Sequence, residues 1–413
     1  MAENLKVKEL AGMVNERRPD GVSACLGRAN PELAAIVAKA LEGKEITVPE
    51  ADILFAAGSP EDIAALAIAA DHVRKEDVGD VVTYVVNRNI NFTNICDVYC
   101  GFCNFMAPEG DEKAYFLSME EIADKTKEAW EIGATEVCMQ GGMHPRINGD
   151  YYVDLIKNVK KAVPGMHTHA FSPYEVWYGA NTLGIEETDF INMLKDAGHD
   201  TFPGTAAEVL VEDVRKKIAP RKIPTEVWIR VVEKIHNAGM RTTSTIMYGH
   251  LDEPKHWSIH LNVLRDIQKR TGGFTEFVPL RFIPWETRIY KNSKGKVHEG
   301  PTDIHQLKMY AVSRLFLRGW IDNIQVSWVK QGPEFAQFSL TAGANDFGGT
   351  LMEEQISRHA GASYGQYFPP EEFRRLTREI GRIPAERNTV YGILKRFDGE
   401  TETVQGNGAQ DAG

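Results

Sequence analysis

The sequence predicts an α/β protein built on a (β/α)8 barrel of the TIM type, with an N-terminal helical extension. Between residues 79 and 365, short β-rich runs alternate with helical stretches, which is typical of βα units that pair into a parallel sheet. Eight β-rich runs occur there, the number that such a barrel needs. The 413 residues are enough for one barrel with extensions at both ends.

Residues 1–78 are predicted to form the helical extension. Apolar residues recur there at three- and four-residue intervals. Two helix starts are marked by Thr47 with Glu50, a capping box, and by Ser59 before Pro60. Helices are expected at 5–17, 31–42, 50–56 and 60–74.

The barrel is predicted to occupy residues 79–365. Its strands are expected at 82–86, 135–139, 166–171, 199–202, 240–247, 275–280, 322–328 and 342–346. Helices are expected between them, for example at 118–131, 225–237 and 256–270. Chemistry in such barrels takes place at the C-terminal ends of the strands, so the residues just after each strand are the functional candidates.

The C-terminal part divides into two predicted segments. Residues 366–397 are expected to be a helical segment, with a helix at 369–384 after two consecutive prolines. Residues 398–413 are rich in glycine and acidic or polar side chains, with little to bury, which predicts a disordered tail.

Composition limits the class of protein. Hydrophobic residues make up 43% and charged residues 25%, as in ordinary globular proteins. A formal net charge of −11 argues against a sequence-independent nucleic-acid binder, and the apolar run at 63–70 is too short to span a membrane. Five cysteines form no disulfide framework, and the N-terminus has no apolar core for a signal peptide, so a cytoplasmic location is expected.

The most informative segment holds Cys96, Cys100 and Cys103, at spacing C-x3-C-x2-C after the first expected strand. Thiolates suit zinc or iron–sulfur clusters. A closed zinc site or a four-cysteine cluster requires a fourth ligand, whereas Cys25 and Cys138 lie in unrelated contexts. Three thiolates on a four-iron cluster leave one iron open to bind another molecule. A structural zinc site, or three cysteines without a metal, are the alternatives.

This triad resembles that of the radical S-adenosylmethionine (SAM) superfamily. The resemblance implies a 4Fe-4S cluster held by the three cysteines, with SAM on the open iron, and an external electron donor. The aromatic residues of the segment, Tyr99 and Phe102, are then expected to contact the cofactor.

Paired glycines follow the second expected strand, in Gln140-Gly141-Gly142-Met143. They allow a ligand to approach the backbone closely. Superfamily members often have Glu where this chain has Met143, so the resemblance implies backbone contacts from Gln140, Gly141 and Gly142 but no carboxylate contact there. His144, next in sequence, is either a turn residue or a ligand contact.

Polar residues also follow the third and fourth expected strands. Ser172 and Glu175 lie where ribose hydroxyls and a substrate amine are expected, although both could instead cap the next helix. His167 and His169 share one face of a strand and are either packing residues or ligands of a second metal. Glu208 follows a turn of small residues and is a candidate for both cofactor binding and catalysis.

Candidates on the later strands are fewer. Met247, Gly249 and His250 end the fifth strand, where the superfamily packs SAM's adenine. Asn345 and Asp346 are expected to end the eighth strand and to clamp a substrate as catalytic residues, with an Asx turn as the alternative reading. The aromatic wall of the site is expected to come from Tyr248, Phe282, Trp285 and Trp328.

The strand-end motifs together resemble one subfamily, which contains deazaflavin-forming enzymes and futalosine-pathway enzymes of menaquinone biosynthesis. The strings that carry the resemblance begin at Met139, His169, Pro203, Ser244, Phe277 and Asn345. Those at Pro203 and Asn345 look most like the tyrosine-transferring branch that acts in coenzyme F420 biosynthesis.

That branch implies a specific reaction. The Cα–Cβ bond of L-tyrosine breaks, and a 4-hydroxybenzyl group joins 5-amino-6-(D-ribitylamino)uracil. A partner radical SAM enzyme is expected to complete the deazaflavin ring. The alternatives are a futalosine-pathway enzyme, either aminofutalosine synthase or dehypoxanthine futalosine cyclase, and an electron-transfer or structural iron–sulfur protein.

Overall fold

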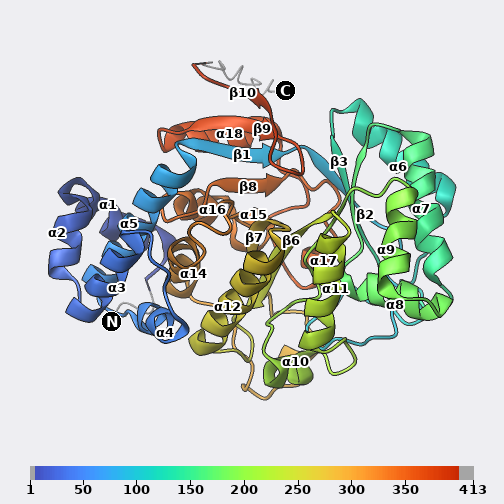
Figure 1. Ribbon diagram of the computed structural model, residues 1–413, viewed down its shortest axis with the longest axis horizontal. Coiled ribbons are helices and arrows are strands. Elements are labelled where there is room, and N and C mark those ends of the chain that lie inside the picture. The colour runs from blue at the N-terminus through green and yellow to red at the C-terminus, as the bar shows by residue number, and fades with distance from the viewer. Residues whose placement is uncertain (1–4, 400–413) are drawn as a thin grey trace, which may run out of the picture.

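The computed structural model describes residues 5–399. The chain forms a (β/α)8 barrel, and the helices of its N-terminal extension pack against the outside of the barrel (Figure 1). The predicted tail, 398–413, lies outside the described residues except for 398 and 399. The strands are β1 (Val81–Val85), β2 (Asn87–Asn91), β3 (Glu136–Gln140), β4 (His167–Ala170), β5 (Thr201–Phe202), β6 (Arg241–Tyr248), β7 (Phe274–Arg281), β8 (Asp346–Gly349), β9 (Ile383–Arg387) and β10 (Ile393–Arg396).

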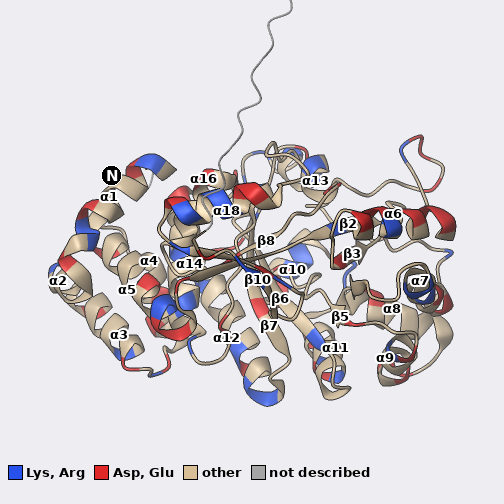
Figure 2. Ribbon diagram, turned by 90° about the horizontal axis from the view of Figure 1, so that it is seen from above, with Lys and Arg blue, Asp and Glu red and all other residues tan. Residues whose placement is uncertain are grey.

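Six strands form a parallel sheet in the order β2-β3-β4-β5-β6-β7, as the alternation of strands and helices predicts. Helices follow these strands and cover the outside of the sheet (Figure 1). Figure 2 shows both signs of charge along these outer helices, α6 and α7 among them. The helices that cover this part of the barrel are α6 (Met119–Glu131), α7 (Gly149–Ala162), α8 (Pro173–Leu183), α9 (Glu187–Asp196), α10 (Glu212–Ile218), α11 (Thr225–Asn237) and α12 (Pro254–Thr271).

The barrel closes through β1 and β8. Only Val86 separates β1 from β2, so these two strands are the halves of one barrel strand, and β1 pairs in parallel with β8. The prediction of a strand at 322–328 is wrong, because this segment contributes only isolated bridges, from Ile324 to Phe277 and from Gln325 to Asp346. These bridges still join β7 to β8.

The N-terminal extension is helical, as predicted. Its central helix is α5, whose apolar run at 63–70 is buried on all sides because α1, α2, α3 and α14 surround it. The capping box of Thr47 with Glu50 is present, and Ser59 accepts a hydrogen bond from Asp62 N at 3.1 Å. These helices are α1 (Val7–Arg17), η2 (Arg18–Asp20), α2 (Gly21–Arg28), α3 (Pro31–Leu41), α4 (Val48–Ala56) and α5 (Pro60–Val78).

The C-terminal segment differs from the prediction of a helical segment at 366–397. A helix, α18 (Pro370–Glu379), is followed by the hairpin of β9 and β10. Strand β9 lies parallel to β1, on the side of β1 away from β8. The helices between β7 and α18 are α13 (Arg288–Lys291), α14 (Asp303–Phe316), α15 (Trp328–Gln331), α16 (Pro333–Leu340) and α17 (Ile356–His359). Across 5–399, no helix combines the length and apolar character needed to cross a membrane.

A buried ionic cluster closes the N-terminal end of the barrel. Arg387, on β9, donates from Nε to Asp346 Oδ2 at 2.6 Å and from Nη2 to Asp346 Oδ1 at 3.0 Å. Thr83 Oγ1 donates to the same carboxylate at 2.5 Å, and Glu276 lies 3.6 Å from Arg387. Tyr391 bonds to Glu276. The hairpin therefore fixes β8, β7 and β1 to one another beneath the barrel.

Candidate active site

One cavity of about 390 Å³ lies at the C-terminal ends of the barrel strands. It brings together residues that follow or end β2, β3, β4, β5, β6, β7 and β8, as the barrel geometry requires. Of the predicted site residues, those that line it are Cys96, Cys100, Phe102, Cys103, Gln140, Gly141, Gly142, Ser172, Glu175, Glu208 and Met247. Phe282, from the predicted aromatic wall, lines it as well, whereas Tyr248, Trp285 and Trp328 do not.

The three cysteines of the triad all line this cavity. No cysteine pair forms a disulfide among the described residues. Burial raises the pKa of the Cys100 thiol to about 12 and also raises that of Cys103. Ionised thiolates at this site therefore need positive charge beside them, which iron provides.

The backbone after β3 packs tightly against the segment that carries the triad. Gly142 N donates to Thr93 O at 2.8 Å, and a Cβ added at Gly142 would lie 2.2 Å from Ile95 O and 2.9 Å from Cys96 Cβ. A Cβ at Gly141 would meet Phe92 at 2.3 Å. Only glycine fits at either position, because Phe92, Ile95 and Cys96 pack against the backbone there. The approach of a ligand to this backbone stays a prediction.

The triad suits a multi-iron cluster better than a single ion. Within residues 5–399, no three His, Cys, Asp or Glu side chains are arranged to hold one metal ion. In a four-iron cluster each cysteine sulfur binds a different iron, so the sulfurs need not converge on one point. His167 and His169 instead bond to Thr201 Oγ1, each at 2.8 Å, and so are packing residues. His144 is a turn residue, because its Nδ1 accepts from Arg146 N at 3.1 Å.

Glu175 links the glycine pair to helix α8. Its carboxylate accepts from Ser172 N at 2.6 Å and from Gly141 N at 3.3 Å, and Ser172 caps the helix through Glu175 N. The sequence left open whether Ser172 and Glu175 cap the helix or lie in the binding site, and the structure shows that they do both. Burial raises the pKa of Glu175 to about 7, so its carboxyl group can gain or lose a proton near neutral pH.

Glu208 forms a second charged group in the cavity. Its backbone has a positive φ of 43°, and its carboxylate lies 2.5 Å from Lys222 Nζ and 3.5 Å from Arg215 Nη1. Lys222 Nζ also lies 5.3 Å from the centroid of the Phe102 ring. Burial opposes the charge on Lys222, but the Glu208 carboxylate outweighs it and raises the pKa of the lysine. This cation remains charged beside the triad.

The cavity also holds two cations, Arg281 and Lys330, to which no sequence motif assigned a role. The guanidinium of Arg281, at the end of β7, makes no hydrogen bond or ion pair with another described residue, and its Nε is buried without a partner. Lys330 donates to Ser357 Oγ at 2.7 Å, and burial lowers its pKa. Glu354 is held by Ser357 N at 3.0 Å. Lys330 lies just beyond the irregular segment 322–328. If that segment is counted as a barrel strand, Lys330 follows its C-terminal end, where functional residues of such barrels are expected.

The structure does not support a clamp by Asn345 and Asp346. Strand β8 begins at Asp346, whereas the sequence predicts that these residues end a strand. Asp346 is therefore bound to Arg387 at the opposite end of the barrel. Asn345 Oδ1 accepts from Arg314 Nη2 and Ile324 N, both at 2.8 Å. Both residues hold the barrel together, and neither lines the cavity.

Gly249, His250 and Tyr99 also lie outside the cavity lining. Gly249 N donates to the Asp252 carboxylate at 2.9 Å, and fully buried His250 lies 3.0 Å from the same group. These contacts form a turn behind Met247, which does line the cavity. Tyr99 is 37% exposed, on the outer side of the triad segment.

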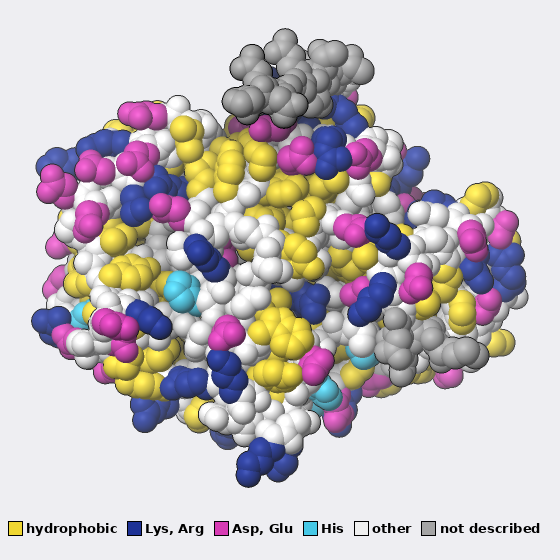
Figure 3. All heavy atoms as spheres, turned by 180° about the vertical axis from the view of Figure 1, so that it is seen from behind, with side chains coloured by type: hydrophobic (Ala, Val, Ile, Leu, Met, Phe, Trp, Pro, Cys, Tyr) yellow, Lys and Arg dark blue, Asp and Glu magenta, His cyan; other side chains and the backbone are white. Residues whose placement is uncertain are grey.

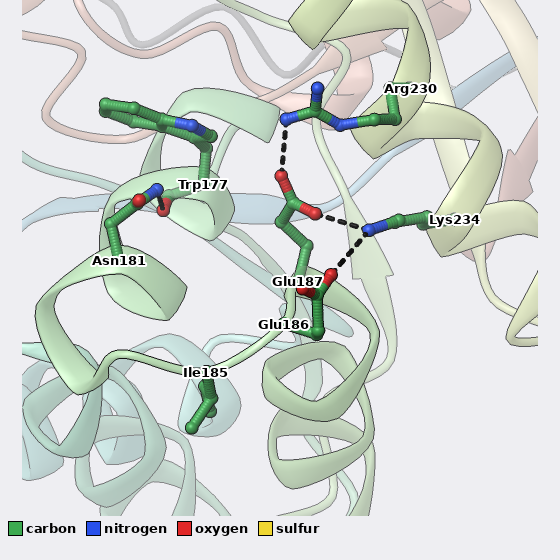
Figure 4. Close-up of a pocket in the computed structure, with 7 residues that line it drawn as sticks. All are labelled: Trp177, Asn181, Ile185, Glu186, Glu187, Arg230 and Lys234. Atoms are coloured by element: carbon green, nitrogen blue, oxygen red, sulfur yellow. Dashed lines mark hydrogen bonds and ion pairs between the residues drawn. The ribbon is translucent and has the colours of Figure 1, made fainter.

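A second hollow, of about 400 Å³, lies on the outer surface between α8, α9 and α11 (Figure 4). Its charges are compensated within the hollow. Glu187 accepts from Arg230 at 2.7 Å and from Lys234, and Lys234 also pairs with Glu186 at 3.4 Å. None of the predicted site residues lines it.

Comparisons with known proteins agree with the triad and the barrel. Residues 90–261 match the model of the radical SAM superfamily, and residues 271–398 match that of the CofH/MqnC C-terminal region. In solved structures, methylornithine synthase has a TM-score of 0.67 at 19% identity over 85% of this chain and 97% of its own. A maturase of the [FeFe]-hydrogenase has a TM-score of 0.69 at 17% identity over 90% of this chain and 80% of its own. These two likenesses show the fold.

Sequence relatives are closer. The 5-amino-6-(D-ribitylamino)uracil–L-tyrosine 4-hydroxyphenyl transferase of Methanocaldococcus jannaschii is 49% identical over 85% of this chain and 98% of its own length. That of Methanothermobacter thermautotrophicus is 49% identical over 86% of this chain and 96% of its own. The FO synthase of Streptomyces avermitilis is 46% identical over 94% of this chain but only 44% of its own length. The chain therefore belongs to the radical SAM superfamily of enzymes and, within it, to the family of 5-amino-6-(D-ribitylamino)uracil–L-tyrosine 4-hydroxyphenyl transferases.

Proposed function

We propose that this enzyme cleaves the Cα–Cβ bond of L-tyrosine and transfers the 4-hydroxybenzyl group to 5-amino-6-(D-ribitylamino)uracil in deazaflavin synthesis. The observation that carries the proposal is that one cavity holds both the cysteine triad and two cations, Arg281 and Lys330, that form no ion pair with a described carboxylate. Names of relatives 49% identical over nearly their whole length support the choice of substrates.

The triad wall is the cofactor side of the cavity. Cys96, Cys100 and Cys103 would hold the 4Fe-4S cluster, and the backbone at Gly141 and Gly142 would lie against SAM. When bound and reduced, this pair of cofactors supplies a carbon radical that abstracts hydrogen from the substrate. Phe102 and Met247 provide apolar surface there, which excludes water from a reactive species.

Arg281 and Lys330 would bind the carboxylate of tyrosine. Arg281 has no anionic partner among the described residues, and the lowered pKa of Lys330 reflects a charge buried without enough compensation. An incoming carboxylate supplies the missing negative charge, and charge-assisted hydrogen bonds of this kind are strong. Glu354, beside Lys330 and Ser357, would then face the substrate ammonium.

Glu175 would take part in proton transfer. Its carboxyl group lies in the cavity, and its pKa of about 7 allows both protonation states at neutral pH. Glu208 would instead orient Lys222, since the two are already paired.

The proposed reaction also requires a partner enzyme and an electron donor. The match covers 44% of the Streptomyces FO synthase, which leaves more than half of that protein for other activities. This chain would pass its product to a separate radical SAM enzyme for ring closure, and it would take electrons from an external donor. Its free cysteines and triad also favour a reducing, cytoplasmic location.

The test is an anaerobic assay of protein with a reconstituted cluster. Dithionite, SAM, L-tyrosine and 5-amino-6-(D-ribitylamino)uracil are added, and the products are identified by mass spectrometry. The proposal expects 5′-deoxyadenosine and a hydroxybenzyl–uracil adduct. Release of 5′-deoxyadenosine only with futalosine-pathway substrates would refute it. Cys100→Ser should abolish both products, whereas the matched variant Cys25→Ser, in helix α2, should retain them.

A further inference from the structure

Strand β2 carries a stripe of asparagines on one side of the sheet. Asn87, Asn89 and Asn91 alternate along the strand, so their side chains point the same way. Asn89 and Asn91 line the cavity. Asn87 does not line it, and its Nδ2 donates to Glu136 Oε1 at 2.8 Å. The stripe therefore runs inside the barrel, toward the cavity.

The hydrogen bonding of these amides changes along the stripe. Asn87 uses both ends of its amide, because its Oδ1 also accepts from Leu351 N at 2.8 Å. Asn91 is 9% exposed and donates from Nδ2 to Gln140 O at 3.2 Å, but its Oδ1 is buried without a partner. Oδ1 of Asn89 is also buried without a partner, and no described residue accepts from its Nδ2. A purely structural asparagine would be satisfied as Asn87 is, since an unpaired buried amide destabilises the fold.

Another amide reaches the same cavity from the segment between β7 and β8. Gln325 lines the cavity, and its side chain forms no hydrogen bond with a described residue. Gly348 makes room for this side chain, because a Cβ added there would lie 2.6 Å from Gln325 Nε2. The cavity therefore holds unpaired amides as well as the cations Arg281 and Lys330.

Unpaired amides suit a neutral heterocycle better than an amino acid. A carboxamide presents an N–H donor beside a carbonyl acceptor, which complements a ring N–H beside a ring carbonyl. The ionic groups of tyrosine have Arg281, Lys330 and Glu354 as partners in the proposed function, and its phenol has a single hydroxyl to offer. The uracil ring of the other substrate has N–H groups, carbonyl groups and an exocyclic amine, so it can satisfy several amides at once.

We infer that Asn89 binds the imide edge of this pyrimidine, with its Oδ1 accepting from the ring N3–H and its Nδ2 donating to a neighbouring ring carbonyl. Asn91 and Gln325 bind other polar groups of the same ring. The inference rests on the proposed function, from which the identity of the pyrimidine is taken. Asn89 is then a specificity-determining residue, because a ring without N3–H leaves its buried Oδ1 unpaired.

The outer surface agrees with selection inside the cavity. A surface field of one sign guides charged ligands, whereas the uracil is neutral and tyrosine is a zwitterion. Figure 3 shows Lys and Arg side chains interspersed with Asp and Glu side chains over the back face. Selection of a neutral ring therefore depends on short-range hydrogen bonds such as those of Asn89.

The test is anaerobic calorimetric titration of protein that carries its cluster and SAM, without a reductant, so that binding is measured without turnover. The two ligands are 5-amino-6-(D-ribitylamino)uracil and its N3-methyl derivative, which lacks the ring donor. Asn89→Ala removes the amide and leaves room for the methyl group. The matched control is Asn104→Ala, because Asn104 also lines the cavity but its Nδ2 already donates to His359 O at 2.8 Å.

Wild type should bind the N3-methyl derivative about 10- to 100-fold more weakly than the parent. Asn89→Ala should bind the parent more weakly by a similar factor, and it should bind the two ligands within about threefold of each other, because the partner of N3–H is gone. Its affinity for SAM and its KM for tyrosine should stay within about twofold of wild type, and its unfolding midpoint should not fall, since the amide has no partner in the fold. Asn104→Ala should bind both ligands as wild type does.

The inference is wrong if Asn89→Ala discriminates between the two ligands as strongly as wild type, or if it loses affinity for SAM or tyrosine as much as for the pyrimidine. An equal loss in Asn104→Ala would also overturn it. Failure of the proposed function appears differently, as a wild-type protein that binds neither pyrimidine and makes no adduct when a reductant and tyrosine are added.

Discussion

Replacing Arg387 with methionine tests whether the ionic cluster beneath the barrel is structural. The change removes two charged hydrogen bonds to Asp346 and leaves that fully buried carboxylate with donors only from Thr83 Oγ1 and Gly348 N. Breaking a buried ion pair by removing one partner costs about 3–5 kcal/mol in free energy of unfolding. Total stabilities are typically about 5–15 kcal/mol, so the loss should be large.

The assay is guanidinium unfolding of the cluster-free protein, followed by fluorescence. Arg387→Met should lower the transition midpoint with little change in slope. Arg396→Met, which removes an exposed pair with Asp398, should cost no more than about 1 kcal/mol. Removing both charges in Arg387→Met/Asp346→Leu should recover part of the loss, since no carboxylate is then left unpaired at position 346.

The same variants separate a structural role from a catalytic one. Asp346→Asn should lower stability but leave the activity of the folded protein close to wild type, because Asp346 does not line the cavity. An Arg387→Met variant as stable as wild type, or a loss of turnover by more than about 100-fold in folded Asp346→Asn, would refute this reasoning.

Three further outcomes are expected. Arg281→Gln should raise the KM for tyrosine by about 30-fold or more, because one cation of the carboxylate site is lost, and it should leave the affinity for SAM unchanged. Steady-state kinetics measures the KM, and equilibrium dialysis measures the affinity for SAM. Equal losses for both ligands would contradict the assignment. The folded-state pKa of Glu175 is raised from 4.5 to about 7, so between these pH values the folded protein binds one proton that the unfolded protein has lost. The free energy of unfolding of the wild type, compared with that of Glu175→Gln, should therefore fall as the pH rises through this window. Unfolding at several pH values measures the difference. Cys138→Ser should retain wild-type iron content by chemical analysis, since Cys138 lines the cavity but lies outside the triad.

Much of the site could be predicted because spacing along the chain fixed it. The triad, the paired glycines and the capping box at Ser172 are local patterns, and each lies in the cavity. Asp346 shows the limit of such reasoning. The segment before it looked like a strand, but β8 starts only at Asp346, and so the residue lies at the opposite end of the barrel.

The remaining differences come from long-range contacts. Strand β9 forms where a helix was expected because β1 offers it an open edge, and no local pattern in 383–387 reports that partner. Lys330 reaches the cavity from the short helix α15, and Glu354 reaches it from the loop between β8 and α17. Their position depends on how the barrel closes, which only the assembled fold determines.

The neighbours of β1 also impose an order on how the protein is made. Thr83 pairs with Asp346 and Val81 with Ile383, so the first barrel strand waits for partners that the ribosome adds long after it. The segment from β2 to β7 has its pairing partners earlier and can assemble during synthesis. The segment that carries the triad therefore lies between strands, β2 and β3, that can pair before β1 finds β8 and β9.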